Sequence, residues 1–244
     1  MHLNCKFAPN WASNIVKCDN IDALLRLRDF NRIVPQPLVL DIICGGISHY
    51  VEEQFQQGKN WRDLLENPVF LDAFAEEKRY PFEPRYTAVQ AARRYWLGYR
   101  LYGYLTWHEW RCDKWGTKWN ASEYRLDLDN GEVRFHTAWE HPYPVIAALS
   151  RQFPDEVFCA SFADEYIGSR TGVYDMQNGK VLASRKFKNG SCEAFEMAFQ
   201  HWDCAEDYVL RNGYYRHIDD DYIDDDEDHC EDGDEDTPES APPS

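Results

Sequence analysis

The spacing of hydrophobic positions changes several times along the chain, and each change predicts the border of a structural element. Residues 11–18 alternate between apolar and polar side chains as a strand does. Residues 21–30 then carry leucines at helical spacing, behind residues able to cap a helix. Pro35 and Pro37 hold the residues before them extended. The pattern therefore predicts a strand, a helix and a break.

A long helical segment follows this break. From residue 38 to about residue 110, apolar residues recur every three or four positions in three successive groups. The groups lie within residues 39–50, 64–74 and 88–99. We interpret residues 38–114 as a helical subdomain inserted after the first helix.

Two β-hairpins are predicted in the second half of the chain. An Asn-Gly pair interrupts the alternating residues 124–139 at position 130, and another interrupts residues 173–187 at position 178. Asn-Gly between alternating segments is a strong hairpin signal, because both residues readily adopt the positive φ angles that a two-residue hairpin turn requires.

Two helices and a strand accompany these hairpins. Pro142 and Pro144 begin a helix that Pro154 ends, and residues 157–166 follow as a strand. A last helix is predicted from Cys192, with these residues on one face: Phe195, Phe199, Trp202 and Val209.

In chain order, these elements predict an α+β protein. They correspond to a ferredoxin-like β-α-β-β-α-β sandwich with a helical insertion after the first helix, an appended hairpin plus C-terminal helix, and a disordered acidic tail. The predicted borders give the first strand and helix at 1–37, the helical insertion at 38–114, the remainder of the ferredoxin-like domain with the C-terminal helix at 115–212, and the tail at 213–244.

The formal charge of −17 comes mainly from that tail. Residues 218–244 hold 14 Asp or Glu and no Lys or Arg, which leaves 29 acidic against 26 basic residues before them. A nearly neutral body has no general attraction to nucleic acid or anionic membrane, although a local basic patch stays open. The tail is either a solubilising segment, which we favour, or a mimic of nucleic-acid charge.

Cysteine usage and hydropathy favour the cytoplasm. The eight cysteines form no C-x-x-C pair, and the N-terminus lacks the apolar core of a signal peptide. No apolar run reaches the roughly 18 residues of a membrane span. We expect a soluble cytoplasmic protein with no membrane association.

The run from Trp115 to Asn120 is the most distinctive motif. It places two indoles, a glycine and Lys118 within six residues, which suits a recognition surface because indoles stack on planar groups and lysine adds charge. The alternative is core packing, with Gly116 making a tight turn. A second expectation pairs Lys118 with Glu165 near Trp139, in a structural rather than a catalytic role. The candidate binding residues are Trp115, Lys118, Trp119, Asn120, Trp139 and Glu165.

Several segments together resemble the YubB-like proteins of phages and plasmids. The resemblance covers roughly residues 9–190 and departs from the family in residues 1–8, at Ala12 where the family more often has Cys, and in the tail. It implies a ferredoxin-like domain and a cytoplasmic accessory role, with no established activity. The segments that carry it are residues 9–14, 30–35, 115–121 and 137–139, with Glu165 and the glycine that follows it.

Metal and cofactor chemistry is not predicted. His108 and Cys112 lie four apart on a predicted helix, and His201 and Cys204 lie three apart on another. Together these pairs could supply zinc ligands, but neither spacing matches a familiar zinc finger. We therefore predict no metal site and no cofactor.

Catalysis is not favoured either. Candidate nucleophiles, bases and acids occur, but no motif places them together. Gly45-Gly46 lacks the lysine and spacing of a phosphate loop. We name no catalytic residue. An unrecognised enzyme stays open as a further alternative, with a site at the junction of sheet and insertion that would hold Glu165, Lys118 or a histidine. The scattered ingredients for nucleophilic catalysis are Cys159, Ser161, His136, His141 and Asp164.

A ferredoxin-like sheet can also bind RNA through outward-facing aromatic residues. The candidates here lack the accompanying Lys/Arg-Gly-aromatic signature, so nucleic acid is the second alternative. The first expectation is binding to a host protein, with the oligomeric state left open. The aromatic candidates on the sheet are His136, Phe158, Phe162 and Tyr166.

Overall fold

A computed structural model describes residues 10–77 and 86–219. The chain divides into two compact units, residues 1–203 and residues 204–244. The first unit contains a six-stranded antiparallel sheet and a group of helices inserted into it.

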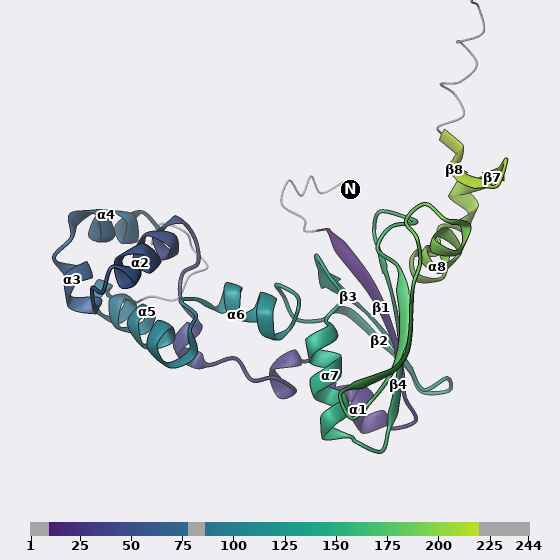
Figure 1. The fold of residues 1–244 in the computed structure, drawn as a ribbon, viewed down its shortest axis with the longest axis horizontal. Helices are drawn as coiled ribbons and strands as arrows, with labels where there is room; N and C mark the ends of the chain where they lie inside the picture. Colours follow the sequence, from purple (N-terminus) through teal and green to yellow (C-terminus); the bar gives the residue numbers. More distant parts are fainter. Residues whose placement is uncertain (1–9, 78–85, 220–244) are drawn as a thin grey trace, which may run out of the picture. The chain divides into compact units, whose positions relative to one another are not determined.

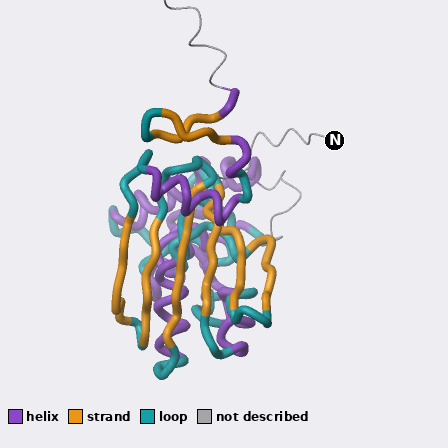
Figure 2. The backbone as a smooth tube through the Cα atoms, turned by 90° about the vertical axis from the view of Figure 1, so that its right-hand side faces the viewer, coloured by secondary structure: helices purple, strands orange, loops and turns teal. Residues whose placement is uncertain are grey.

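The sheet has the strand order β2-β3-β1-β4-β5-β6, and Figure 2 shows its strands side by side. The first four strands are the ferredoxin-like set, in which β1 lies between β3 and β4 and pairs antiparallel with both. The hairpin β5-β6 extends the sheet beyond β4. The strands are β1 Trp11–Lys17, β2 Ser122–Asp127, β3 Glu132–Ala138, β4 Val157–Asp164, β5 Gly172–Gln177 and β6 Lys180–Lys186.

Helices α1 (Ile21–Arg26) and α7 (Tyr143–Gln152) cover one face of the sheet (Figure 1). Asn20 caps α1 by accepting a hydrogen bond from Ala23 N, as its position before the helix predicts. Alternate residues of β1 and β3 face these helices and form the main core. Its fully buried members include Val16, Leu24, Val133, Phe135, Ile146, Leu149 and Phe158.

Helix α8 (Cys192–Trp202) lies on the opposite face, against β1 and β4 (Figure 1). The predicted helix continues too far, because α8 ends at Asp203 in a left-handed conformation with φ of 52°. Val209 therefore lies in a strand of the second unit rather than on the helix. A left-handed residue at this position stops a helix by turning the chain away.

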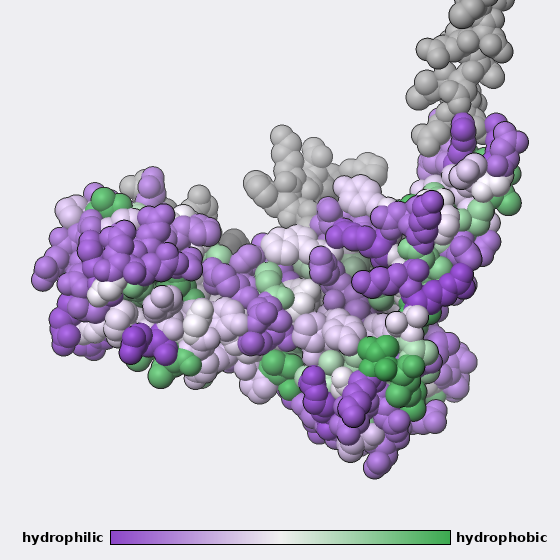
Figure 3. Space-filling model, viewed as in Figure 1, coloured by the Kyte–Doolittle hydropathy of each residue, from purple (hydrophilic) through white to green (hydrophobic). Residues whose placement is uncertain are grey.

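The inserted segment between α1 and β2 is helical, as the sequence predicts. Two short 3-10 helices, η1 (Phe30–Arg32) and η2 (Leu38–Leu40), come first. Around α2 to α5 a second core forms, and Figure 3 shows that the outer face of this region is mostly hydrophilic. The helices are α2 Gly46–Gln56, α3 Trp61–Leu65, α4 Pro68–Glu77, α5 Ala88–Tyr102 and α6 Trp107–Lys114.

The second unit contains a short 3-10 helix, η3 (Ala205–Asp207), and a hairpin of β7 (Tyr208–Arg211) with β8 (Tyr214–His217). Its turn, Asn212-Gly213, has positive φ at both residues, the backbone of a type I′ turn. Strand β8 occupies residues that the sequence predicts as the start of the acidic tail, whereas β7 lies within the predicted 115–212 segment. The rest of that tail, from residue 220, lies outside the described residues.

Within residues 10–77 and 86–219, none of the helices is long and apolar enough to cross a bilayer.

Candidate functional site

The side chain of Lys118 lies between two tryptophans. Its Nζ is 5.1 Å from the ring centroid of Trp119 and 5.0 Å from that of Trp139. Trp11 packs on Trp119 at 6.1 Å, and His108 packs edge-on against Trp139 at 5.6 Å. All five side chains are partly exposed. We call these five residues the tryptophan–lysine surface.

Trp139 is held in a backbone conformation that bulky residues rarely adopt. It follows β3 with φ of 74°, and its N donates a 2.6 Å hydrogen bond to Asn10 O. A left-handed conformation costs a residue with a Cβ about 1–2 kcal/mol. Strain of this kind concentrates at functional sites, and here it accompanies an indole that is 37% exposed.

Buried neighbours in the chain position Lys118 and Trp119. Thr117 is 1% exposed and its Oγ1 donates a 2.7 Å hydrogen bond to Ala138 O. Gly116 has φ of 76°, and a Cβ there would lie 2.7 Å from Pro144 Cδ. The short segment is therefore anchored on its inner side and presents its next two residues outward.

Two of the six predicted binding residues are structural. Trp115 is 2% exposed, donates from Nε1 to Val34 O at 2.9 Å, and packs edge-on against Phe30. Asn120 Oδ1 accepts from Phe30 N at 2.8 Å, and its Nδ2 donates to Asp29 Oδ1 at 2.9 Å. Both side chains hold the end of the insertion against η1.

Glu165 does not pair with Lys118. Among the residues that the structure describes, Lys118 forms no ion pair, and the expectation of a Lys118–Glu165 pair is wrong. The backbone N of Glu165 instead donates to Trp11 O at 2.9 Å, which extends the contact between β4 and β1. The charge of Lys118 is therefore directed at aromatic rings.

The sequence interpretation missed Trp11 and His108. Trp11 reaches the site because β1 pairs with β3 in a register that places it opposite Ala138. His108 reaches it from the first turn of α6. Burial lowers the pKa of His108, with a smaller contribution from Lys118. The available signal for Trp11 was a large aromatic residue at the start of the first predicted strand.

A cavity of about 570 Å³ shares Trp139 with the tryptophan–lysine surface. Its walls include the aromatic residues Tyr143 and Phe162 and the basic residues Arg170 and Lys186. Arg170 forms an ion pair with Asp164, which is 2% exposed. The hydroxyl of Thr171, also in the wall, is buried and has no hydrogen-bond partner among the residues that the structure describes. The cavity thus offers aromatic walls, positive charge and one unused polar group.

A buried polar chain forms one side of this cavity. His141 Nδ1 lies 2.7 Å from Asn14 Oδ1, and His141 Nε2 lies 2.6 Å from the Tyr174 hydroxyl. Since Oδ1 can only accept, the imidazole donates from Nδ1 and accepts a hydrogen bond from the tyrosine hydroxyl at Nε2. Burial lowers the pKa of His141 to about 3 and raises that of Tyr174. The chain is fully satisfied and neutral, which is a structural role.

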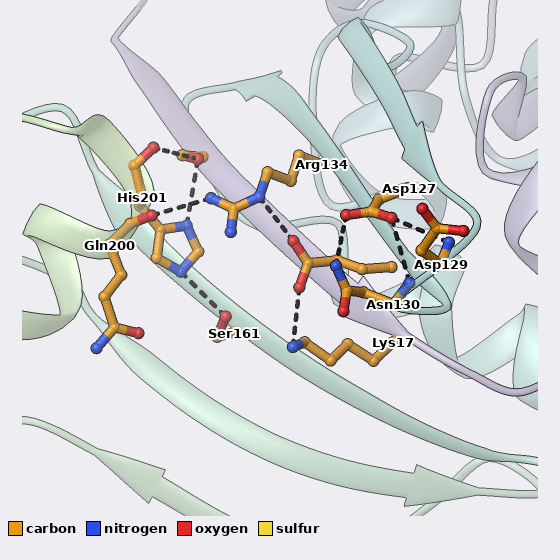
Figure 4. A network of polar contacts seen from close by, with 10 residues as sticks. Lys17, Asp127, Asp129, Asn130, Arg134, Ser161, Gln200 and His201 are labelled. Atoms are coloured by element: carbon orange, nitrogen blue, oxygen red, sulfur yellow. Dashed lines mark hydrogen bonds and ion pairs between the residues drawn. The ribbon is translucent and has the colours of Figure 1, made fainter.

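A second histidine joins α8 to the sheet (Figure 4). His201 Nε2 lies 3.0 Å from Ser161 Oγ, and its Nδ1 lies 3.2 Å from Ser13 Oγ. Burial, followed by Arg134, lowers the pKa of His201 to about 4. Arg134 donates to Gln200 O at 3.0 Å and to Glu132 at 2.7 Å, so the same network continues along β3.

The proposed ingredients of an enzyme are not assembled into catalytic machinery. Ser161 faces His201, but the other imidazole nitrogen meets a hydroxyl rather than an orienting carboxylate. Asp164 is held by Arg170. Burial raises the pKa of Cys159 to about 11, which makes its thiol a weak nucleophile.

The sheet face that RNA-binding relatives of this fold use is partly covered. Helix α8 lies across it, and the ring of Trp202 packs against His136 at 4.9 Å. Phe158 is fully buried in the main core, and Phe162 stacks on His141 on the α7 side. Tyr166 is exposed in the loop after β4. The predicted aromatic platform is therefore not formed by these residues.

Comparison with known proteins agrees with the fold. Residues 114–205 match a family model described as the ferredoxin-like domain in Api92-like protein. A crystal structure of protein api92 from Yersinia pseudotuberculosis aligns over 75% of this chain and 99% of its own, with 11% sequence identity and a TM-score of 0.39. No curated protein matches the sequence. The C-terminal half of the ferredoxin-like sandwich is thus similar to the domain found in Api92-like proteins.

Proposed function

We propose that this protein acts by binding a partner protein through the tryptophan–lysine surface. The observation that carries the proposal is the position of Lys118 between the partly exposed rings of Trp119 and Trp139. Tryptophan is enriched among the residues that dominate the binding energy of protein interfaces. A cation fixed between two indoles adds a charged centre to such a surface.

The surroundings of this surface favour a protein ligand. The residues that contribute most to binding energy in a protein interface cluster around pockets that an anchoring side chain of the partner fills. The cavity beside Trp139 supplies such a pocket, and Lys186 in its wall gives it a positive charge for an acidic group of the partner. The nearly neutral body gives no general electrostatic attraction to a nucleic-acid ligand.

The sequence resemblance adds a biological setting to the proposal. The segments shared with YubB-like proteins support a phage or plasmid origin and a cytoplasmic accessory role. A protein of that origin meets host proteins as its main potential partners, so the proposed partner is a host protein.

The test is a quantitative binding experiment with matched variants. The intact protein, Trp119→Ala and Tyr166→Ala are immobilised at equal density and exposed to bacterial lysate, with and without nuclease treatment. Tyr166 is 61% exposed and lies outside the surface, so its variant controls for loss of any exposed ring. Each retained protein is then purified and its Kd measured directly.

We expect a purified partner that binds the intact protein and Tyr166→Ala equally and Trp119→Ala at least roughly tenfold more weakly, as a hot-spot residue requires. Equal Kd values for all three proteins would show that the tryptophan–lysine surface does not take part in binding the partner. Retention that disappears with nuclease treatment would instead favour nucleic-acid binding.

A further inference from the structure

Three metal-ligating side chains converge where α6 begins. One ligand atom each from Cys44, His108 and Glu109 lie within 4.8 Å of one another, and all three residues are partly buried. His108 and Glu109 belong to the first turn of α6, whereas Cys44 precedes α2. Residues 64 positions apart in the sequence are therefore brought together by the tertiary structure.

A fourth potential ligand lies on the same helix. Cys112 Sγ is 4.0 Å from His108 Nε2, as expected for residues four apart on one helical face. The four side chains offer two thiols, one imidazole and one carboxylate. This donor set suits zinc, which binds sulfur and nitrogen ligands in tetrahedral sites.

We propose that Cys44, His108 and Glu109 form a binding site for a divalent transition metal of the zinc type, with Cys112 or a water molecule as fourth ligand. The metal would connect the segment before α2 to α6. This site lies next to the tryptophan–lysine surface, because the ring of His108 contacts Trp139.

Zinc coordinates deprotonated thiols and neutral imidazoles, so metal binding at this site is coupled to proton release. Each thiol that binds the metal forms a metal–sulfur bond and releases one proton to solvent. Metal affinity therefore falls as pH falls.

Binding requires small movements. Neighbouring ligand atoms of a tetrahedral zinc ion lie about 3.5 Å apart, so the cluster must contract by roughly 1 Å. Glu109 Oε2 also accepts hydrogen bonds from the N and Oγ1 of Thr106, which cap α6. Its second carboxylate oxygen can coordinate while the cap is kept.

Cobalt(II) titration of the reduced, full-length protein tests the proposal. Cobalt bound to thiolate gives an intense charge-transfer band, whereas cobalt bound only to the carboxylates of the C-terminal segment does not. We expect one cobalt per chain with this band, its displacement by one equivalent of zinc, and a change in tryptophan fluorescence through the contact of His108 with Trp139.

Two ligand variants and one control decide the outcome. Cys44→Ser and His108→Ala should each lower zinc affinity more than roughly 100-fold, since even outer-shell changes cost 10–100-fold. Cys159→Ser removes a thiol from the sheet and should leave affinity unchanged. Circular dichroism establishes that each variant is folded.

Absence of the charge-transfer band in the folded wild-type protein would overturn the proposal. A band that survives in both folded ligand variants, or that is lost in Cys159→Ser alone, would also overturn it. Since partner binding is not measured, the outcome is independent of the function proposed above.

Discussion

The ammonium group of Lys118 lies 5.0 Å from the centre of the Trp139 indole, and no acidic side chain among the described residues pairs with it. A lysine at the surface usually extends into water or towards a carboxylate. Here its position between two rings joins the segment after α6 to the end of β3. This arrangement makes the charge available to a ligand while it stabilises the rings that surround it.

Replacing Lys118 with Met should raise the pKa of His108. The positive charge of Lys118 contributes to lowering that pKa, after burial, and methionine keeps the length of the chain without the charge. Histidine titration by NMR measures the change, with His136 as internal reference because Lys118 is not among the causes of its shift. An unchanged pKa for His108 would place Lys118 farther from the ring than the structure does.

The Trp139→Gly variant should be more stable than the Trp139→Ala variant. In most contexts alanine is favoured over glycine, but the φ of 74° at Trp139 penalises any Cβ. We expect Trp139→Gly to unfold with a free energy about 1 kcal/mol higher than Trp139→Ala. Urea denaturation of both variants measures the difference. Equal stability, or greater stability of the alanine variant, would mean that this backbone is not strained.

Mild acid should destabilise the protein through its two buried histidines. The pKa values of His141 and His201 are lowered to about 3 and about 4, from the ordinary value of 6.5. The unfolded chain therefore takes up protons below pH 6.5 that the folded protein does not. Burial of these neutral imidazoles makes its full contribution to the free energy of unfolding above about pH 6.5. As pH falls towards 4, this contribution is lost by up to about 1.4 kcal/mol per pH unit for each histidine.

Denaturant unfolding at several pH values in this window measures the effect. His201→Gln should remove one of the two contributions and so reduce the slope of unfolding free energy against pH by about half. A slope as steep in the variant as in the wild type would show that His201 titrates normally in the folded protein.

Asn120 should matter for stability rather than for binding. Its Oδ1 accepts hydrogen bonds from Phe30 N and Ala121 N, at 2.8 and 2.9 Å. Asn120→Ala leaves these donors unsatisfied and should cost about 1–3 kcal/mol. Gln56→Ala, which removes one long hydrogen bond on an exposed helix face, is the control and should change stability by less than about 0.5 kcal/mol. A comparable loss in both variants would contradict the structural role of Asn120.

Local sequence was sufficient for most of the fold. The alternation in β1, the Asn-Gly turns and the prolines before α7 act over a few residues, so their consequences are readable without tertiary structure. The order of these elements then left few topologies, because a split β-α-β unit packs its helices on one face. The end of α8 was not readable, since Asp203 gives no glycine-like signal for its left-handed turn.

The candidate site depended on contacts that spacing does not encode. Trp115 and Trp119 belong to one short motif, yet Trp115 is in the core and Trp119 is at the surface. Gly116 reverses the backbone between them, and the side to which each indole turns depends on Pro144 and Phe30, which are distant in sequence. Of the two alternatives that the sequence left open, core packing therefore describes Trp115 and surface exposure describes Trp119.

By itself, the sequence determined the kinds of elements, their order, and the aromatic and charged residues available to a site. Only the tertiary structure decided that Lys118 lies against tryptophans rather than Glu165, and that His108 lies close to Cys44, which is distant from it in the sequence. The physical reason is that secondary structure follows from interactions within a few residues. Side-chain partners follow instead from strand register and from which faces of the sheet and the insertion are buried.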